Sequence, residues 1–216
     1  MNNLDVKSTQ LSDGLSKRWQ LLWPALTADV ISSTFCLIES HYREKHRAYH
    51  TLEHIQACLS HLDCQDVNPD KRRELELAIW FHDVIYSPYK SNNEALSAEL
   101  AVATLSRLSE KKETISRVSD LILLTKHPSI PQTAQEQLML DIDLSILGSD
   151  PQLYSQYEDW IRQEYQWVPG VIYRKGRIKL LEQFMSQPTI YHTEVFQDKR
   201  EKQARRNIKW AIAQLN

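Results

Sequence analysis

Residues 80–83 read Trp80-Phe81-His82-Asp83, within an apolar run of helical spacing that extends from Leu75 to Val84. A histidine beside a carboxylate on a buried segment costs free energy unless another group pairs with them. Asp70, ahead of the run, can cap the helix. The stretch therefore predicts a buried helix that carries a chemically active polar pair. Taken alone, the pair could also be an incidental polar step near the end of a helix.

Most other segments of the chain also place apolar residues at helical spacing, with short loops marked by proline. Strand-like alternation, an internal repeat and a linker are absent from the sequence. We therefore expect one all-α domain over residues 1–216, a helical bundle of about ten helices. The expected helices cover about 11–23, 28–38, 52–62, 70–86, 95–108, 111–125, 134–147, 151–166, 170–186 and 194–215.

The composition excludes several classes of function. A net charge of −2 leaves no basic surface for nucleic acid, and four glycines in 216 residues offer no glycine-rich phosphate loop. The three cysteines contain no CxxC pair, which argues against a disulfide framework or a zinc ribbon. No apolar run is long enough to cross a membrane, and the N-terminal stretch does not read as a signal peptide. We therefore expect a cytoplasmic protein without a membrane or a stable nucleic-acid partner.

Two histidines upstream are candidate partners of the pair. His50 and His54, in Tyr49-His50-Thr51-Leu52-Glu53-His54, are four residues apart and would share a helix face. Thr51 or the preceding loop begins the apolar period, so His54 lies inside a helix and is the better ligand. His50, about one turn earlier, suits a proton donor or a group beside the ligands. The alternative is that both are ordinary surface or core histidines.

Two carboxylates downstream are further candidates. Asp141 and Asp143 lie in an apolar helical run, where buried carboxylates need partners. Residues two apart do not share a helix face, so we expect one of them to be a ligand and the other a capping or supporting group. The spacing does not decide between them, and a solvated helix face is the alternative reading.

Taken together, these motifs resemble the HD superfamily of metal-dependent phosphohydrolases, whose ligands occur in the order His, His-Asp, Asp. The resemblance rests on Tyr49-His50 followed by His54, on Phe81-His82-Asp83, and on Asp143-Leu144-Ser145. It covers about residues 15–215 and is closest to the small bacterial group described as predicted metal-dependent HD phosphohydrolases. A more distant similarity extends to cyclic nucleotide phosphodiesterases.

The resemblance implies a metal-binding core at about residues 45–150, with C-terminal helices over 151–216 packing on it. It implies His54, His82, Asp83 and Asp143 as metal ligands, and the choice of Asp143 over Asp141 rests on the Asp-Leu-Ser match. Such a set suits a divalent ion such as Mn²⁺, Fe²⁺, Co²⁺, Ni²⁺ or Mg²⁺ better than a closed zinc site. We expect one ion per chain, although a second could bind, since only His127 lies between the His-Asp pair and Asp143.

The implied reaction is hydrolysis of a phosphoester or phosphoanhydride in a small compound, including nucleotides, by a metal-activated water. His50 would protonate the leaving oxygen, as the corresponding histidine does in the phosphodiesterase relatives, and Asp141 or Asp143 would orient the water. Arg47 is the first candidate for contacting the phosphate, followed by Lys126 and then by the basic cluster Arg174–Lys179. Asn93 and Glu94 could line the mouth of the pocket or simply cap a helix.

Two other functions stay open. The chain could keep the fold and bind a metal or ligand without catalysis, or it could be an iron-dependent oxygenase on the same fold. The oxygenase would need more histidine ligands than the sequence offers. The C-terminal helix could pack internally or pair with a second copy, so a homo-oligomer is open as well.

Overall fold

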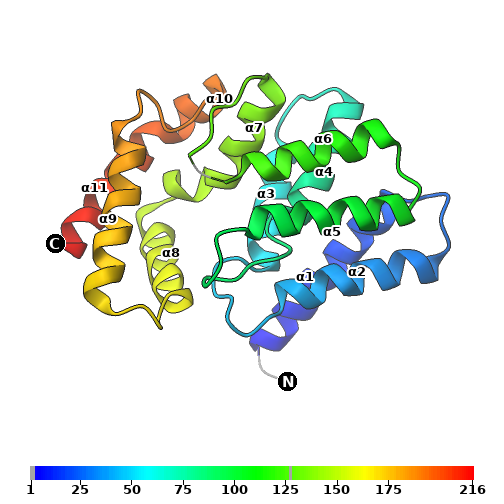
Figure 1. Ribbon diagram of the computed structural model, residues 1–216, viewed down its shortest axis with the longest axis horizontal. Helices are drawn as coiled ribbons and strands as arrows, with labels where there is room; N and C mark the ends of the chain where they lie inside the picture. Colours follow the sequence, from blue (N-terminus) through cyan, green and yellow to red (C-terminus); the bar gives the residue numbers. More distant parts are fainter. Residues whose placement is uncertain (1–2, 127) are drawn as a thin grey trace. The chain divides into compact units, whose positions relative to one another are not determined.

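The computed structural model describes residues 3–126 and 128–216. The chain divides into two compact units, of which the first ends at Lys126 and the second covers the residues that follow. Figure 1 labels their helices, with the first unit running from blue to green and the second from green to red. The described residues contain helices and no strand, which confirms the predicted all-α class.

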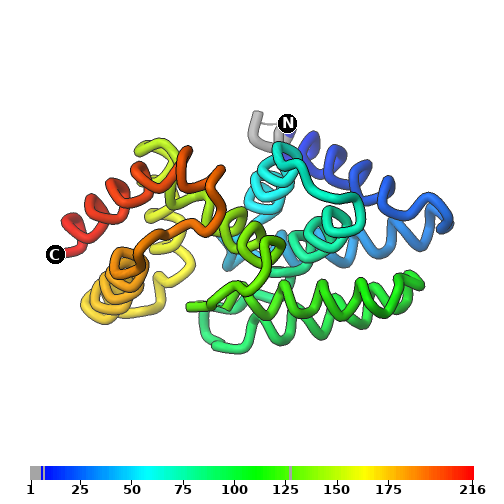
Figure 2. Tube along the Cα trace, turned by 90° about the horizontal axis from the view of Figure 1, so that it is seen from above, coloured from blue at the N-terminus to red at the C-terminus, as the bar shows by residue number. Residues whose placement is uncertain are grey.

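The first unit is built from six helices. They are α1 (Asn3–Leu21), α2 (Ala28–Tyr42), α3 (Leu52–Asp63), α4 (Pro69–Phe81), α5 (Asn93–Arg107) and α6 (Lys112–Leu124). Helix α4 packs against α3, α5 and α6, and α1 packs against α2 and α3. Figure 2 shows α1 and α2 running side by side at the blue end of the chain. The helix that carries the opening motif is therefore the centre of this unit.

Helix α4 is buried around its whole circumference near its C-terminal end, where every residue from Leu75 to Phe81 is buried. Apart from Glu76, whose carboxylate pairs with Arg18 of α1, this stretch is apolar and needs neighbours on all sides, and α3, α5 and α6 supply them. The predicted cap at Asp70 is wrong by two residues. Asn68 is the N-cap, because its side chain accepts a hydrogen bond from the Asp70 backbone N–H and Pro69 takes the first helical position.

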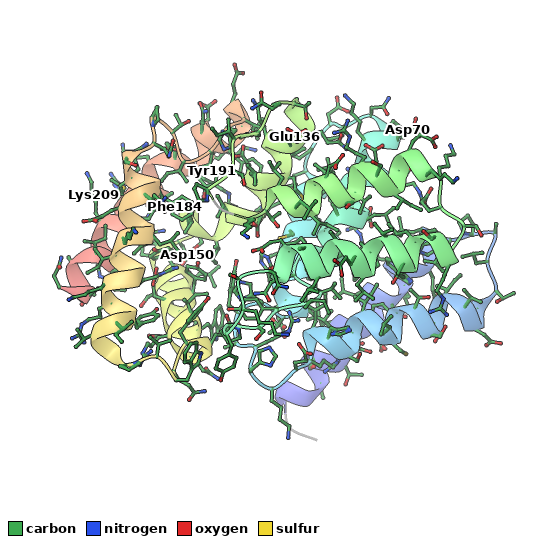
Figure 3. The ribbon with its side chains drawn as sticks, viewed as in Figure 1. Asp70, Glu136, Asp150, Phe184, Tyr191 and Lys209 are labelled. Atoms are coloured by element: carbon green, nitrogen blue, oxygen red, sulfur yellow. The ribbon has the colours of Figure 1, made fainter. Side chains whose placement is uncertain are left out.

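The second unit contains the remaining helices. They are α7 (Ala134–Asp143), a 3₁₀ turn η1 (Leu144–Gly148), α8 (Pro151–Glu164), α9 (Gly170–Ser186), α10 (Glu194–Phe196), a π-helical segment η2 (Gln197–Glu201) and α11 (Lys202–Leu215). Asp150, labelled in Figure 3, caps α8 by accepting hydrogen bonds from the Gln152 and Leu153 backbone N–H groups. The predicted helices 134–147 and 194–215 are thus interrupted by a 3₁₀ turn and by a π segment.

Side chains from the C-terminal segment hold the η1 turn. The Tyr191 hydroxyl (Figure 3) donates to the Leu144 carbonyl at 3.1 Å. The Asn207 side-chain amide donates to the Leu147 and Ser149 carbonyls at 2.8 and 2.9 Å. A helix end leaves carbonyls without intrahelical partners, and these donors satisfy them. The segment that follows Asp143 is therefore fixed within its own unit.

The boundary between the units lies at Lys126, inside the range 45–150 that the sequence predicts as a metal-binding core. The single domain over 1–216 stays a prediction. Among the described helices, none combines the length and the apolar character that a membrane span requires.

Candidate metal centre

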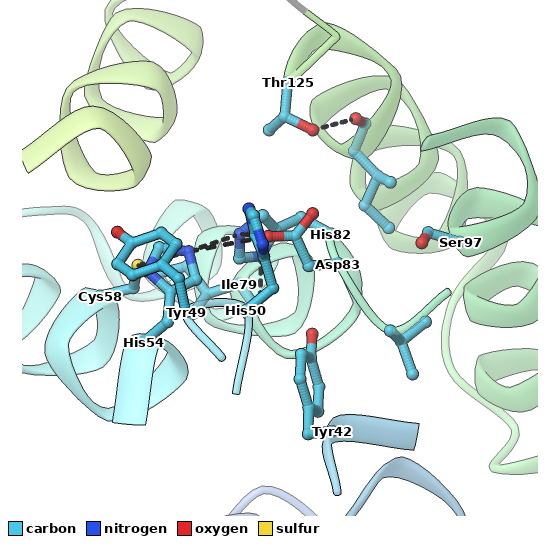
Figure 4. A network of polar contacts seen from close by, with 12 residues as sticks. Tyr42, Tyr49, His50, His54, Cys58, Ile79, His82, Asp83, Ser97 and Thr125 are labelled. Carbon is cyan, nitrogen blue, oxygen red and sulfur yellow. Dashed lines mark hydrogen bonds and ion pairs between the residues drawn. The ribbon is translucent and has the colours of Figure 1, made fainter. Parts of the chain in front are cut away.

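Three predicted ligands meet in the first unit (Figure 4). His54 lies in the first turn of α3, behind the N-cap Thr51. His82 is the C-cap of α4, where its backbone N–H still bonds to the Ala78 carbonyl, and Asp83 follows in the turn. The His-Asp pair therefore lies at the end of the helix, where the turning backbone lets adjacent side chains point to the same place.

The ligand atoms lie close together. His54 Nε2 is 3.1 Å from His82 Nε2, His82 Nε2 is 3.2 Å from Asp83 Oδ2, and His54 Nε2 is 3.7 Å from that oxygen. A triangle with these sides has a circumradius of about 1.9 Å, which is close to the metal distances of imidazole nitrogen and carboxylate oxygen, about 2.0–2.2 Å. One ion can thus contact all three atoms. The site fits a divalent cation.

The orientation of His82 favours the same conclusion. Its Nδ1 lies 2.9 Å from the Ile79 carbonyl oxygen. A carbonyl only accepts, so Nδ1 carries the hydrogen and, in the neutral ring, Nε2 presents its lone pair to His54 and Asp83. Metal-bound histidines commonly have such a partner on the other ring nitrogen. Two imidazoles and a carboxylate thus converge here, and one cation could contact all three.

An aromatic ring and a buried thiol surround His54. The Tyr49 ring lies 4.8 Å from the imidazole, centroid to centroid, and the buried thiol Sγ of Cys58 lies 3.7 Å from both ring nitrogens. His54 and His82 are themselves buried, while Asp83 is half-buried. The site is therefore largely shielded from water, and its carboxylate is its more accessible member. Sequence reasoning missed Cys58, although its position one helical turn after His54 gives the signal.

His50 lies beside the ligands, in the segment before α3. Its ring stacks on Tyr86 with centroids 4.1 Å apart, and the centroid of the His54 ring is 6.2 Å away. His50 is half-buried. This location agrees with the predicted separation of about one helical turn and keeps the ring near the centre without making it a member of the triangle.

Arg47 lies close by but is fully engaged with protein groups. Its side chain has 0% exposure, and its N–H groups donate to a Glu44 carboxylate and to the carbonyls of His50, Asp83 and Val84. These partners favour a structural role over the predicted phosphate contact. Tyr42 is a second group that the sequence did not reveal. Its hydroxyl donates to the Trp80 carbonyl, and burial, with a further contribution from the Asp83 charge, raises the pKa of this phenol well above its usual value.

The other predicted groups of the first unit are Asn93 and Glu94, in the first turn of α5, and Lys126, which follows α6; Asn93 and Lys126 bond to the loop between Asp83 and α5. Asn93 exchanges two hydrogen bonds with the Ser87 backbone, donating to its carbonyl and accepting from its N–H, which pins the loop. Glu94 is half-buried in the first turn of α5, one residue after Asn93 and two after the N-cap Asn92. Lys126 is exposed, and its Nζ donates to the Ser91 carbonyl at 3.1 Å. The N-cap of α5 is Asn92, so Asn93 and Glu94 lie inside the helix, and the Asn92 side chain makes no capping hydrogen bond.

The two downstream carboxylates have different environments within the second unit. Asp143, half-buried, is the last residue of α7. Asp141 has 0% exposure and accepts hydrogen bonds from the His192 N–H and from both the N–H and hydroxyl of Thr193. Burial raises the pKa of the Asp141 carboxyl, although these donors act in the opposite direction. From the sequence, Asp141 could be a supporting group or a group that orients a catalytic water. Its contacts favour the supporting role.

The basic cluster Arg174–Lys179 separates into two kinds of residue. Arg174, Lys175 and Lys179 are exposed on α9. Arg177 is buried and forms a two-bond ion pair with Glu158 at 3.0 and 2.8 Å. This arginine is a structural contact between α8 and α9. His127, considered for a second metal, lies outside the described residues.

Neither a family model, nor a curated protein, nor a solved structure matches this chain. The chemistry of the centre therefore rests on its own residues: two imidazoles and a carboxylate that could hold a divalent metal ion.

Proposed function

We propose that this protein is a metal-dependent phosphohydrolase of the HD type, acting on a nucleotide or another small phosphate compound. The observation that carries the proposal is the convergence of His54 Nε2, His82 Nε2 and Asp83 Oδ2 within 3.7 Å of one another. The resemblance of the sequence to the HD superfamily supports the choice of reaction.

We further propose Asp143 as the fourth ligand and one ion of Mn²⁺, Fe²⁺, Co²⁺, Ni²⁺ or Mg²⁺ per chain. Two imidazoles and two carboxylates are a mixed donor set that suits six-coordinate divalent ions. When bound, such an ion lowers the pKa of a coordinated water and polarises a phosphoryl oxygen. The choice of Asp143 rests on the Asp-Leu-Ser motif and on the half-buried position of this residue at the end of α7.

The protein's own side chains supply the remaining steps. His50 is partly accessible, and its stacking on Tyr86 holds the ring in a fixed orientation, so it can donate a proton to the leaving oxygen. Lys126 is an exposed cation in the same unit and can attract the phosphate. Arg47 and Asp141 are occupied by protein partners, so this proposal gives each of them a structural role within its own unit and no contact with the substrate.

The test has two stages. The protein is purified from metal-replete cells and its metal content measured. It is then assayed against nucleotides and generic phosphoesters with Mn²⁺, Fe²⁺, Co²⁺, Ni²⁺ or Mg²⁺. About one ion per chain together with metal-dependent phosphate release supports the proposal. Absence of stoichiometric metal contradicts it. Bound metal without turnover of any phosphate compound favours the non-catalytic alternative, and oxygen consumption with bound iron favours the oxygenase.

A further inference from the structure

Arg47 is a charged group placed where a charge is costly. Its guanidinium carbon lies 5.1 Å from the ring centre of Tyr42 and 5.5 Å from that of Tyr86, and its side chain has no exposed surface. Taking a guanidinium out of water is unfavourable unless its N–H groups find partners. The identity of those partners therefore shows what the residue stabilises.

Three of its four hydrogen bonds go to backbone carbonyls of the two segments that carry the candidate ligands. Nη1 donates to the His50 carbonyl at 3.0 Å and to the Asp83 carbonyl at 2.7 Å, and Nη2 donates to the Val84 carbonyl at 2.9 Å. His50 begins the turn that leads into α3 and His54. Asp83 is itself a candidate ligand. A single nitrogen thus bridges the two halves of the metal centre.

A guanidinium is planar, and its donors point in fixed directions, so it sets the separation of the acceptors that it bridges. We propose that Arg47 is a positioning residue that fixes the distance between His54 and the His82–Asp83 pair and so sets the metal affinity of the centre. This inference rests on the proposed function, since it assumes that these side chains bind a metal. It replaces the phosphate contact expected of Arg47 from the sequence.

The ion pair with Glu44 offers a way to separate charge from positioning. Nε of Arg47 donates to a half-exposed Glu44 carboxylate at 3.0 Å, whereas its other three hydrogen bonds go to backbone carbonyls. If Arg47 acts through the carbonyls, loss of the Glu44 charge should matter little for metal binding. Lysine at position 47 keeps the positive charge near the centre. It lacks the second nitrogen that reaches the Val84 carbonyl, and its ammonium donors are not held in the fixed planar directions of a guanidinium.

The experiment measures Mn²⁺ affinity by calorimetry on folded, metal-free protein at a temperature well below unfolding. We expect Arg47→Lys to bind Mn²⁺ about 10–100-fold more weakly, the usual cost of losing a group that orients metal ligands. Glu44→Gln should bind within about threefold of wild type, and Arg43→Lys is the matched control, because Arg43 is half-exposed and pairs with Glu39. In Arg47→Ala, low millimolar guanidinium should recover part of the lost affinity.

The outcomes separate this inference from the proposed function. If wild type binds Mn²⁺ and folded Arg47→Lys binds it equally well, Arg47 serves stability alone and the positioning role is wrong. Equal losses in Arg47→Lys and Glu44→Gln would assign the effect to the ion pair and likewise overturn it. If wild type itself binds no divalent metal, the proposed function and this inference both fail. Should Arg47→Ala not fold, the lysine and glutamine variants still decide the question.

Discussion

The Nε2 atoms of His54 and His82 lie 3.1 Å apart, although one residue belongs to α3 and the other ends α4. Two imidazole nitrogens at this distance need a shared proton or a shared cation between them. Because the Nδ1 hydrogen of His82 is directed to the Ile79 carbonyl, its Nε2 is an acceptor in the neutral ring. This arrangement is compatible with one divalent ion that contacts both rings.

The first prediction concerns these ligands. His82→Ala and Asp83→Ala should each lose stoichiometric metal and any metal-dependent phosphohydrolase activity, because two ligands from this triangle cannot hold the ion as three do. Metal content by mass spectrometry and turnover of a phosphoester panel measure the effect. His61→Ala serves as the control and should keep its metal, because His61 is on the same helix as His54 but in its last turn. Unchanged turnover in either ligand variant would contradict the assignment.

Metal should also stabilise the fold. An ion that binds only the folded state at 100 times its dissociation constant adds about 2.7 kcal/mol to the free energy of unfolding. For a chain of this size we expect Tm to rise by about 5–10 °C. Thermal unfolding with and without a chelator measures the shift. His82→Ala should show the same Tm in both conditions, and a metal-dependent rise in that variant would place the ion elsewhere.

His50 should contribute to the reaction without holding the metal. Its ring stacks on Tyr86 beside the triangle rather than within it. His50→Gln should therefore keep its metal content while kcat falls by about 10²–10⁴-fold, the usual contribution of a general acid. The pH profile of kcat should lose its alkaline limb in this variant. A fall in metal content equal to that of His82→Ala would instead make His50 a ligand.

The second unit gives a prediction at alkaline pH. Burial raises the pKa of Tyr173 to about 12, with the nearby Arg177 and Arg162 charges acting against the shift and Glu158 adding to it. A phenol with a higher pKa in the folded state contributes stability below its ordinary pKa, about 10, and loses it as the pH rises through 12. Urea unfolding at pH 8–12 should show wild type losing stability relative to Tyr173→Phe. Parallel pH curves for the two proteins would contradict the shift.

The helices were predictable from sequence because their signals are local. Asn92 and Thr51 are N-caps at positions where the periodicity begins. The residues from Leu75 to Phe81 are all buried and, except for Glu76, apolar, as suits the central helix α4. His54 and the His82–Asp83 pair could be singled out for the same reason: their residue types stand out against an apolar helix. Partners distant in sequence could not be found in this way.

Arg47 and Asp141 illustrate that limit. Two of the four hydrogen-bond partners of Arg47 are backbone carbonyls 36 and 37 residues away, and a sequence pattern does not show which backbone atoms a side chain will reach. Asp141 bonds to groups 51 and 52 residues away, at His192 and Thr193. From the sequence, each side chain is predicted to be a charged group that takes part in catalysis. In the tertiary fold, both charged groups instead hold main-chain segments in place.

The contrast between Asp141 and Asp143 gives the last prediction. Loss of a group that orients a metal ligand usually lowers metal affinity about 10–100-fold. Asp143→Asn removes a proposed ligand itself, so it should lower the affinity further, with little change in the Tm of the metal-free protein. Asp141→Asn should lower the Tm of the metal-free protein with little change in metal affinity. An amide replaces one accepting oxygen with a donor, so at least one of the half-buried N–H groups at His192 and Thr193 loses its acceptor, at a cost of about 1–3 kcal/mol.

Calorimetric titration with Mn²⁺ and urea unfolding of the metal-free variants measure these two quantities. Because the substitutions are chemically identical and two residues apart, each variant is the control for the other. Loss of metal affinity in Asp141→Asn, with Asp143→Asn unaffected, would exchange their roles and show that the Asp-Leu-Ser motif is the wrong guide to the fourth ligand. Equal affinities in both variants and wild type would leave His54, His82 and Asp83 as the complete protein contribution to the metal centre.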